Sequence, residues 1–178
     1  MKNRKYFVTL LLLTLTLGMV SAFAQKQQQR RRPAARKTAK TPDSRVYLVH
    51  ADVLHFDQTK NADATILNGK VHFTHQGARL YCDSAYFYEA SNSFEAFGHV
   101  KMYQGDTLSL LSDYAYYDGN EQMARARYNV VLKHKKTTLY TDSLDFDRLY
   151  DNAYFFEGGK MIDGKTTLTS DWGEYNIS

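Results

Sequence analysis

The side chains with the clearest potential for chemistry in this sequence are five aspartates that recur at nearly constant spacing. They are spaced by 31, 30, 29 and 29 residues and lie at Asp52, Asp83, Asp113, Asp142 and Asp171. Three of them are followed five residues later by a second aspartate, so paired carboxylates for acid–base catalysis are one hypothesis. A row of calcium ligands is another, but the glycine-rich nonapeptide pattern of calcium-binding arrays is missing. Five equivalent copies favour a structural corner, because a catalytic site needs one constellation and not a row.

The other candidates for catalysis or metal binding are weak. The sequence contains no nucleophile elbow, phosphate loop or dinucleotide fingerprint. Its six histidines are scattered, and His72 and His75 would point to opposite faces of a strand, so they would not easily share a metal ion. The single cysteine, Cys82, cannot form an intramolecular disulfide, and it stands where other repeats have Ala, Ser or Thr. We therefore predict a protein that is not an enzyme and has no metal or cofactor.

The residues around each aspartate predict β-strands that bend. Residues 80–88 (LYCDSAYFY) and 110–118 (LLSDYAYYD) place apolar or small residues three and one positions before the aspartate, and two and four positions after it. These two sets have opposite parity, whereas side chains of a straight strand alternate strictly between its faces. We therefore expect a bulge or corner at each aspartate, whose carboxylate can accept hydrogen bonds from backbone N–H groups that the ladder leaves free.

A second motif lies between successive aspartates and completes a repeat of about thirty residues. Its copies are NGKVHF, FGHVKM, RYNVVL and GGKMID, which begin at residues 68, 97, 127 and 158. The third copy has Tyr128 in place of glycine, and the fourth places Asp163 where an apolar residue is expected. Period-two alternation, intervening turn residues and the absence of proline after Pro42 predict an all-β fold. We expect about nine antiparallel strands, two per unit plus a final half.

The N-terminal 45 residues differ in composition from the rest. Residues 1–24 have a basic start, an apolar run and Ala22 and Ala24 at the −3 and −1 positions of a cleavage site, which predicts a cleaved secretory signal peptide. An uncleaved anchor is the alternative, because the run could just span a bilayer. Residues 25–45, with eight bases and one acid, predict a basic disordered tail. Residues 46–178 carry 12 basic and 18 acidic side chains, which disfavours nucleic-acid binding.

The phased recurrence of DVLHF, DSAYF, DYAYY and DSLDF with GKVHF and GHVKM resembles the OstA-like family, which includes the periplasmic lipopolysaccharide-transport bridge LptA. The resemblance covers residues 46–178. It implies a semi-closed, V-shaped β-jelly roll in the periplasm of a Gram-negative envelope, whose interior binds the acyl chains of lipopolysaccharide for transfer to the outer membrane. The expected groove lining consists of the inward residues near each corner: Leu54, Phe56, Val71, Phe73, Ala85, Phe87, Val100, Met102, Ala115, Tyr117, Val130, Leu132, Leu144 and Phe146.

Two alternatives to a carrier remain open. The same residues would fill a closed core if the domain were a structural module that scaffolds an envelope complex, and a retained leader would make it an inner-membrane-anchored relative of the same transport system. The sequence stops at the start of a fifth unit. We therefore expect residues 168–177 to offer a strand edge for self-association or for pairing with a related jelly-roll domain, unless the chain is the front part of a longer protein.

Overall fold

The computed structural model describes residues 44–56 and 63–177, which form eleven β-strands and their connections without a helix. The predicted signal peptide and nearly all of the predicted basic tail lie outside these residues. The strands are β1 (Tyr47–His50), β2 (Val53–Phe56), β3 (Thr65–His75), β4 (Ala78–Tyr88), β5 (Ser93–Gln104), β6 (Leu108–Asp118), β7 (Met123–His134), β8 (Thr137–Asp147), β9 (Asn152–Asp163), β10 (Thr166–Ser170) and β11 (Gly173–Asn176).

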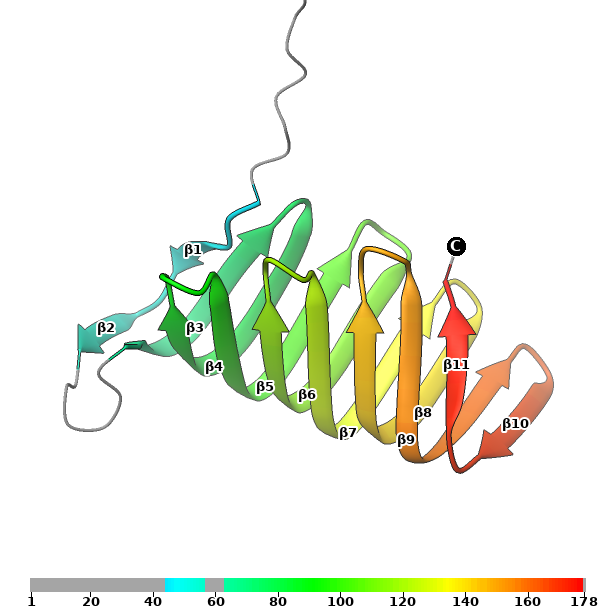
Figure 1. Cartoon of the computed structure of the whole chain (residues 1–178). Coiled ribbons are helices and arrows are strands. Elements are labelled where there is room, and N and C mark those ends of the chain that lie inside the picture. The colour runs from blue at the N-terminus through cyan, green and yellow to red at the C-terminus, as the bar shows by residue number, and fades with distance from the viewer. Residues whose placement is uncertain (1–43, 57–62, 178) are drawn as a thin grey trace, which may run out of the picture. The chain divides into compact units, whose positions relative to one another are not determined.

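All eleven strands belong to one antiparallel sheet (Figure 1). Its order is β1-β3-β4-β5-β6-β7-β8-β9-β10, with β2 also paired to β3 and β11 also paired to β9. The all-β antiparallel fold predicted from the sequence is confirmed. The count rises from about nine strands to eleven because the first and last aspartate segments are each divided, at Asp52 and at Asp171. The internal aspartates lie within continuous strands.

Each neighbouring pair of long strands changes register beside its aspartate. In the β4–β5 pair, Tyr81 faces Lys101 and Ser84 faces Phe97, so β5 has one residue more than β4 over this interval. The odd-numbered strand carries the same excess in every other such pair from β3 to β9. At each register change, two consecutive residues of the odd-numbered strand have positive φ. Gly98, with φ of 71°, is one of them. These bulges bend the strands.

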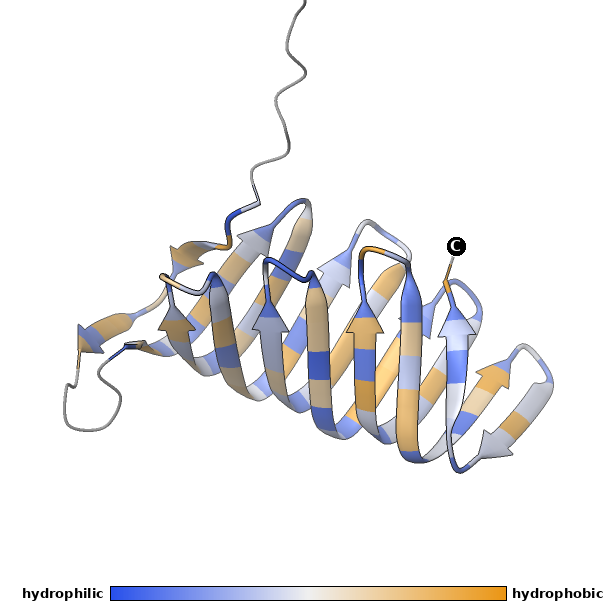
Figure 2. Cartoon of the chain, in the orientation of Figure 1, coloured by the Kyte–Doolittle hydropathy of each residue, from blue (hydrophilic) through white to orange (hydrophobic). Residues whose placement is uncertain are grey.

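The bends fold the sheet into a V with two layers (Figure 1). The front layer contains the half of each even-numbered strand after its aspartate and the half of each odd-numbered strand before its bulge. The back layer contains the other halves. Apolar and polar residues alternate along the strands of both layers (Figure 2). Cys82, before Asp83, and Ala85, after it, are therefore both buried in one core, although their parity differs.

The fourth unit is aligned differently from the sequence expectation. Its residues of positive φ are Glu157 and Gly158, so Gly159 takes the position held by valine in the three units before it. Met161 then occupies the next inward position and packs against the core. The expectation that Asp163 stands at an apolar position was wrong, because Asp163 is the last residue of β9. The bulge at Glu157 and Gly158, and not the second glycine of GGKMID, sets the alignment.

Candidate functional site

The fourteen residues predicted to line a groove lie in three environments. Eleven are buried between the layers: Val71, Phe73, Ala85, Val100, Met102, Ala115, Tyr117, Val130, Leu132, Leu144 and Phe146. Phe87 is half-buried. Leu54 and Phe56 on β2 are exposed, by 52% and 72%. The exposed pair therefore lies at one end of the domain, and the buried set forms its core.

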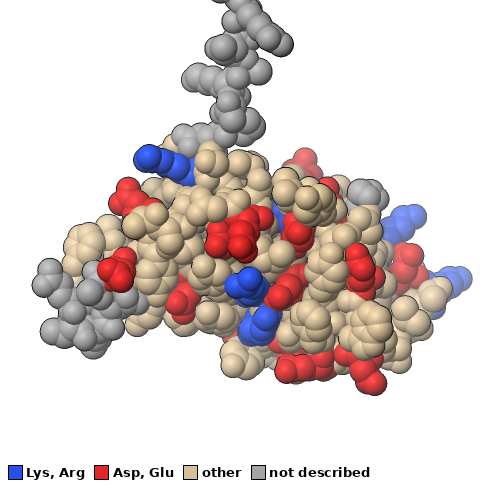
Figure 3. All heavy atoms as spheres, in the orientation of Figure 1, with Lys and Arg blue, Asp and Glu red and all other residues tan. Residues whose placement is uncertain are grey.

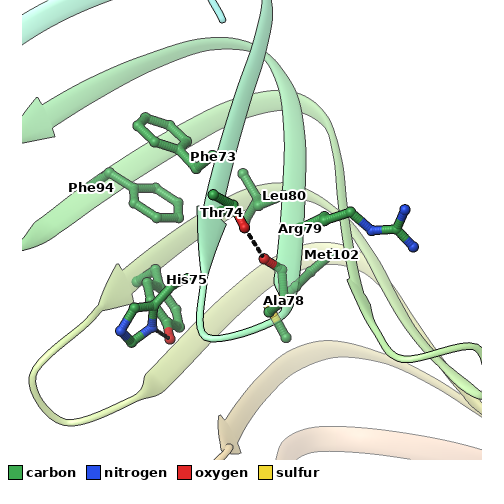
Figure 4. A pocket seen from close by; sticks show the side chains of 9 residues that line it. Phe73, Thr74, His75, Ala78, Arg79, Leu80, Phe94 and Met102 are labelled. Atoms are coloured by element: carbon green, nitrogen blue, oxygen red, sulfur yellow. Dashed lines mark hydrogen bonds between the residues drawn. The ribbon is translucent and has the colours of Figure 1, made fainter. Parts of the chain in front are cut away.

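The interior between the layers is filled. Phe73 from the back layer stacks on Phe94 from the front layer, with ring centroids 4.3 Å apart. The gap beside them, next to Leu80, Met102 and Tyr117, has a volume of only about 10 Å³ (Figure 4). A site of this size is at the lower limit for one water molecule. An acyl chain can therefore enter this part of the interior only if the layers move apart.

A buried polar cluster joins the turn ends of the two layers, and we call it the closing seam: His75, Gln104, Tyr117 and Arg148. His75 Nδ1 lies 2.6 Å from Tyr117 Oη. The Arg148 guanidinium donates to Tyr117 Oη at 2.5 Å and to Gln104 Oε1 at 2.8 Å. His75 and Gln104 end back-layer strands, whereas Tyr117 and Arg148 lie at the turn ends of front-layer strands. The seam therefore ties the free rims of the V together.

The seam holds a buried cation, Arg148, beside a tyrosine that burial keeps neutral. Arg148 is only 8% exposed, and no carboxylate in the described part of the chain forms an ion pair with it. Burial raises the pKa of Tyr117, although the Arg148 charge partly opposes this shift. A second contact extends the seam, where His134 Nδ1 lies 3.2 Å from Tyr175 Oη. Burial and the charge of Lys135 lower the pKa of His134.

Sequence reasoning missed most of the seam. Tyr117 was predicted only as an apolar lining residue, and Arg148 and Gln104 were not predicted to face the interior. A signal was present, because His75 and His134 both end a strand that otherwise presents apolar residues to the core. Each is followed about forty residues later by its tyrosine partner, 42 residues for Tyr117 and 41 for Tyr175.

The V is open at its N-terminal end, where a cleft of about 1010 Å³ lies between β1, β2 and the β4–β5 turn. Its apolar wall includes Leu48, Leu54, Phe56 and Phe87. The Phe87 ring centroid is 5.4 Å from that of Phe73 in the core, so the wall continues directly into the buried interior. Polar and charged groups at the cleft include Arg45, Asp63, Glu89 and Asn92.

The five repeated aspartates each lie against the bulge of the neighbouring strand or make a backbone contact with it. Asp83 Oδ2 is 2.7 Å from the ring of His99, and Asn129 donates from its side chain to Asp113 and from its backbone N–H to Asp142. Asp52 N donates to Gly69 O, and Asp171 O accepts from Gly158 N. A Cβ built on Gly98 would lie 2.5 Å from Asp83 Oδ2, so a larger residue at this position would displace the Asp83 carboxylate.

The described residues contain no cluster of three or more His, Cys, Asp or Glu side chains placed to hold a metal ion. Burial raises the pKa of the Cys82 thiol to about 12, so this cysteine is not a reactive nucleophile at neutral pH. None of the residues that the structure describes forms a helix long and apolar enough to cross a membrane.

The sequence model of the OstA-like protein family matches residues 43–178. No curated protein sequence matches the chain. Among solved structures, the chain is similar to LptH from Pseudomonas aeruginosa, described as the LptA homologous periplasmic component of the lipopolysaccharide transport device. The two share 13% sequence identity with a TM-score of 0.49, over 57% of this chain and 75% of LptH.

Proposed function

The chain belongs to the OstA-like family, and on that premise we propose that it is a non-enzymatic periplasmic carrier that binds lipopolysaccharide for transfer to the outer membrane. The observation that carries this proposal is the apolar cleft at the open end of the V, which leads through Phe87 into the core. Exposed apolar side chains such as Leu54 and Phe56 at the mouth of a cleft are typical of a binding site for an apolar ligand.

The size and chemistry of the cleft suit an acyl chain. Its volume of about 1010 Å³ reaches the upper end of ligand pockets, which run from about 300 to 1,000 Å³. Removing ten methylenes from water contributes about 8 kcal/mol. A cleft that is open to solvent realises only part of this free energy, which suits a carrier that must also release its cargo.

The charged groups at the cleft indicate that lipid phosphates contribute little to the binding affinity. Arg45 is accompanied there by Asp63 and Glu89, so the local charge does not favour an anion. Binding is therefore expected to depend on apolar contact more than on phosphate recognition.

The test is a pair of aspartate substitutions on one strand. We expect Phe56→Asp to weaken lipopolysaccharide binding at least about tenfold, a change of about 1.4 kcal/mol, because a carboxylate at the mouth opposes burial of an acyl chain. Val53→Asp is the control, since Val53 is 54% exposed on β2 but does not line the cleft. Binding is measured by equilibrium titration with fluorescent lipopolysaccharide, and folding by thermal denaturation. Equal affinities in the two variants would contradict a site at this cleft.

One observation favours a second candidate function, a structural module of an envelope complex. The middle of the interior is filled, with Phe73, Phe146 and Leu144 at most 1% exposed. A stably folded protein that takes up no lipopolysaccharide at all would support this function over the carrier.

Association through the ends of the sheet is part of the same proposal. Among the described residues, the path of strands ends at β1 and at β10, and every residue of β10 is exposed. Unpaired strand edges are templates for pairing with another chain. We expect single proline substitutions along β10 to reduce self-association wherever the replaced N–H faces away from β9, as measured by sedimentation velocity. Unchanged association across all five positions would exclude this edge.

A further inference from the structure

Two clusters of matching composition lie on the outer faces of the two layers. The back quartet consists of Arg79, Tyr81, Lys101 and Tyr103; Arg79 faces Tyr103, and Tyr81 faces Lys101, across β4 and β5. The front quartet consists of Tyr114, Tyr116, Arg125 and Arg127; a tyrosine again faces a cation in each cross-strand pair, but both tyrosines lie on β6 and both arginines on β7. Each quartet lines a shallow depression, of about 480 Å³ at the back and about 330 Å³ at the front.

The cations of the front quartet are neutralised by the protein itself. Arg127 forms an ion pair with Asp145 at 2.8 Å, and Arg125 lies 3.9 Å from Glu121. Tyr114 also donates a hydrogen bond to Glu95. Figure 3 shows this face, where acidic side chains surround a small group of basic ones. The front quartet therefore has no unmet requirement for an anion.

The cations of the back quartet have no such partners. Within the described residues, neither Arg79 nor Lys101 forms an ion pair, and Figure 4 shows Arg79 extending away from the core. The two cross-strand rows that contain the quartet hold no acidic residue between β3 and β10. One row is Thr74, Arg79, Tyr103, Ser109, Lys133, Thr138, Ile162 and Thr167; the other is His72, Tyr81, Lys101, Leu111, Val131, Tyr140, Lys160 and Thr169.

The aromatic rings of the back quartet are held in place before any ligand arrives. Tyr81 stacks on His72, with centroids 4.3 Å apart and planes 15° apart, and its ring meets Tyr103 in an edge contact at 6.1 Å. Both tyrosines are half-buried, whereas Arg79 and Lys101 are exposed. Packed rings beside exposed cations offer an apolar platform and charge together.

We propose that the back quartet binds an anionic sugar, a pyranose ring that carries a carboxylate or a phosphate. The rings of Tyr81 and Tyr103 pack against the apolar face of the sugar, and Arg79 and Lys101 bind its anionic group. This site lies on the outer face of the V and is independent of the acyl-chain cleft, so either site can fail without the other.

The test uses the purified full chain and two defined probes: a hexamer of galacturonic acid and a neutral hexamer of galactose. Titration calorimetry at low salt is expected to detect the acidic hexamer and to show at least about tenfold weaker binding of the neutral one. We expect Arg79→Gln with Lys101→Gln to weaken acidic-hexamer binding about tenfold or more, and Tyr81→Ala with Tyr103→Ala to do the same. The matched control, Tyr114→Ala with Arg125→Gln in the front quartet, should change affinity less than about twofold.

A second variant tests the charge argument by gain of function. Asp145→Asn removes the carboxylate that neutralises Arg127, so the front quartet should then bind the acidic hexamer as a second site. Absence of binding by the unmodified chain, equal binding of both hexamers, or no effect of the back-quartet substitutions would overturn the proposal. Binding to vesicles of anionic phospholipid without binding to the acidic hexamer would also overturn it, because the ligand would then be a membrane surface.

Discussion

At the scale of single residues, each bulge requires two left-handed backbone conformations, and the side chain decides what they cost. Gly69 and Gly98 adopt positive φ readily, because glycine has no Cβ. Tyr128, at the position of Gly98 in the next unit, has φ of 64° and a side chain that is 65% exposed. Its ring therefore contributes little burial to offset the backbone strain.

Replacing Tyr128 with glycine should therefore stabilise the domain. We expect the free energy of unfolding to rise by about 0.5–1 kcal/mol, the relief of strain less the added freedom of glycine in the unfolded chain. Urea denaturation measures the change. Asn129→Gly is the control, because asparagine already tolerates positive φ, and its side chain also contacts Asp113. A Tyr128→Gly variant that is less stable than the unmodified protein would show that the exposed ring makes a contribution that outweighs the strain.

The titration of His134 predicts how stability depends on pH. Its pKa in the folded protein lies below the ordinary value of 6.5, chiefly because of burial and secondarily because of Lys135, with Asp151 acting in the opposite direction. Above pH 6.5 neither the folded nor the unfolded state binds the proton, and stability is complete. As the pH falls below 6.5, the unfolded state protonates first and stability is lost. The melting temperature of His134→Gln should therefore decrease less between pH 7 and pH 5 than that of the unmodified protein. An identical decrease would assign the effect to other groups, such as His72, whose pKa is also lowered.

At the scale of secondary-structure elements, the fourth unit differs from the two units before it in two inward positions that flank its bulge. The larger side chain there comes before the bulge and not after it. The second and third units pair alanine before the bulge with valine after it, as in Ala126 and Val130. The fourth unit has Phe155 and Gly159 at these positions. A Cβ on Gly159 would lie 2.4 Å from the Phe155 ring, and one on Gly173 would lie 2.5 Å from it. The ring therefore occupies space that two glycines leave open.

This exchange predicts strong coupling between Phe155 and Gly159. Gly159→Val alone should destabilise the domain by about 1–3 kcal/mol through overpacking, and Phe155→Ala alone by about 3–5 kcal/mol through loss of a buried ring. The double variant restores the alanine and valine of the third unit. Its destabilisation should therefore be at least about 1 kcal/mol smaller than the sum of those of the two single variants. A double-mutant cycle by guanidinium denaturation measures this. Additive effects would mean that the two positions relax independently.

The sequence predicted the bends of the elements better than their alignment. The opposite parity of Cys82 and Ala85 around Asp83 is visible without a structure, because strand side chains alternate strictly. The one-residue excess on each odd-numbered strand is not visible, since it depends on which residues adopt positive φ. Glu157 takes such a conformation although a glycine is nearby, and the fourth unit was therefore aligned two residues late. The contacts of the seam were also not predicted, because they join residues more than thirty positions apart; His75 and His134 at inward strand ends were the only signal for them.

At the scale of the whole domain, the open cleft and the filled interior limit how a lipid can bind. The cleft near Phe56 is accessible as it stands, whereas the space between Phe73 and Tyr117 is closed by the seam. Parting the layers would break the contacts of Arg148 with Tyr117 and Gln104. A ligand that binds only when the layers are apart must supply the free energy of breaking these contacts. Its apparent affinity is therefore lower than its affinity for the open form.

Arg148→Met tests whether acyl chains reach the interior. Methionine keeps an apolar stem but removes the donors to Tyr117 and Gln104, which lowers the stability of the closed arrangement by about 1–3 kcal/mol. If the layers part during binding, the variant should bind lipopolysaccharide more tightly and faster, because less free energy is spent on opening. We expect this increase, measured by stopped-flow fluorescence and equilibrium titration, together with greater hydrogen exchange at the β3–β4 and β5–β6 turns. Tyr128→Gly provides the control, since it changes stability far from the seam. Unchanged affinity and rate in Arg148→Met would confine the acyl chains to the N-terminal cleft, where its apolar wall of Leu48, Leu54, Phe56 and Phe87 would account for binding.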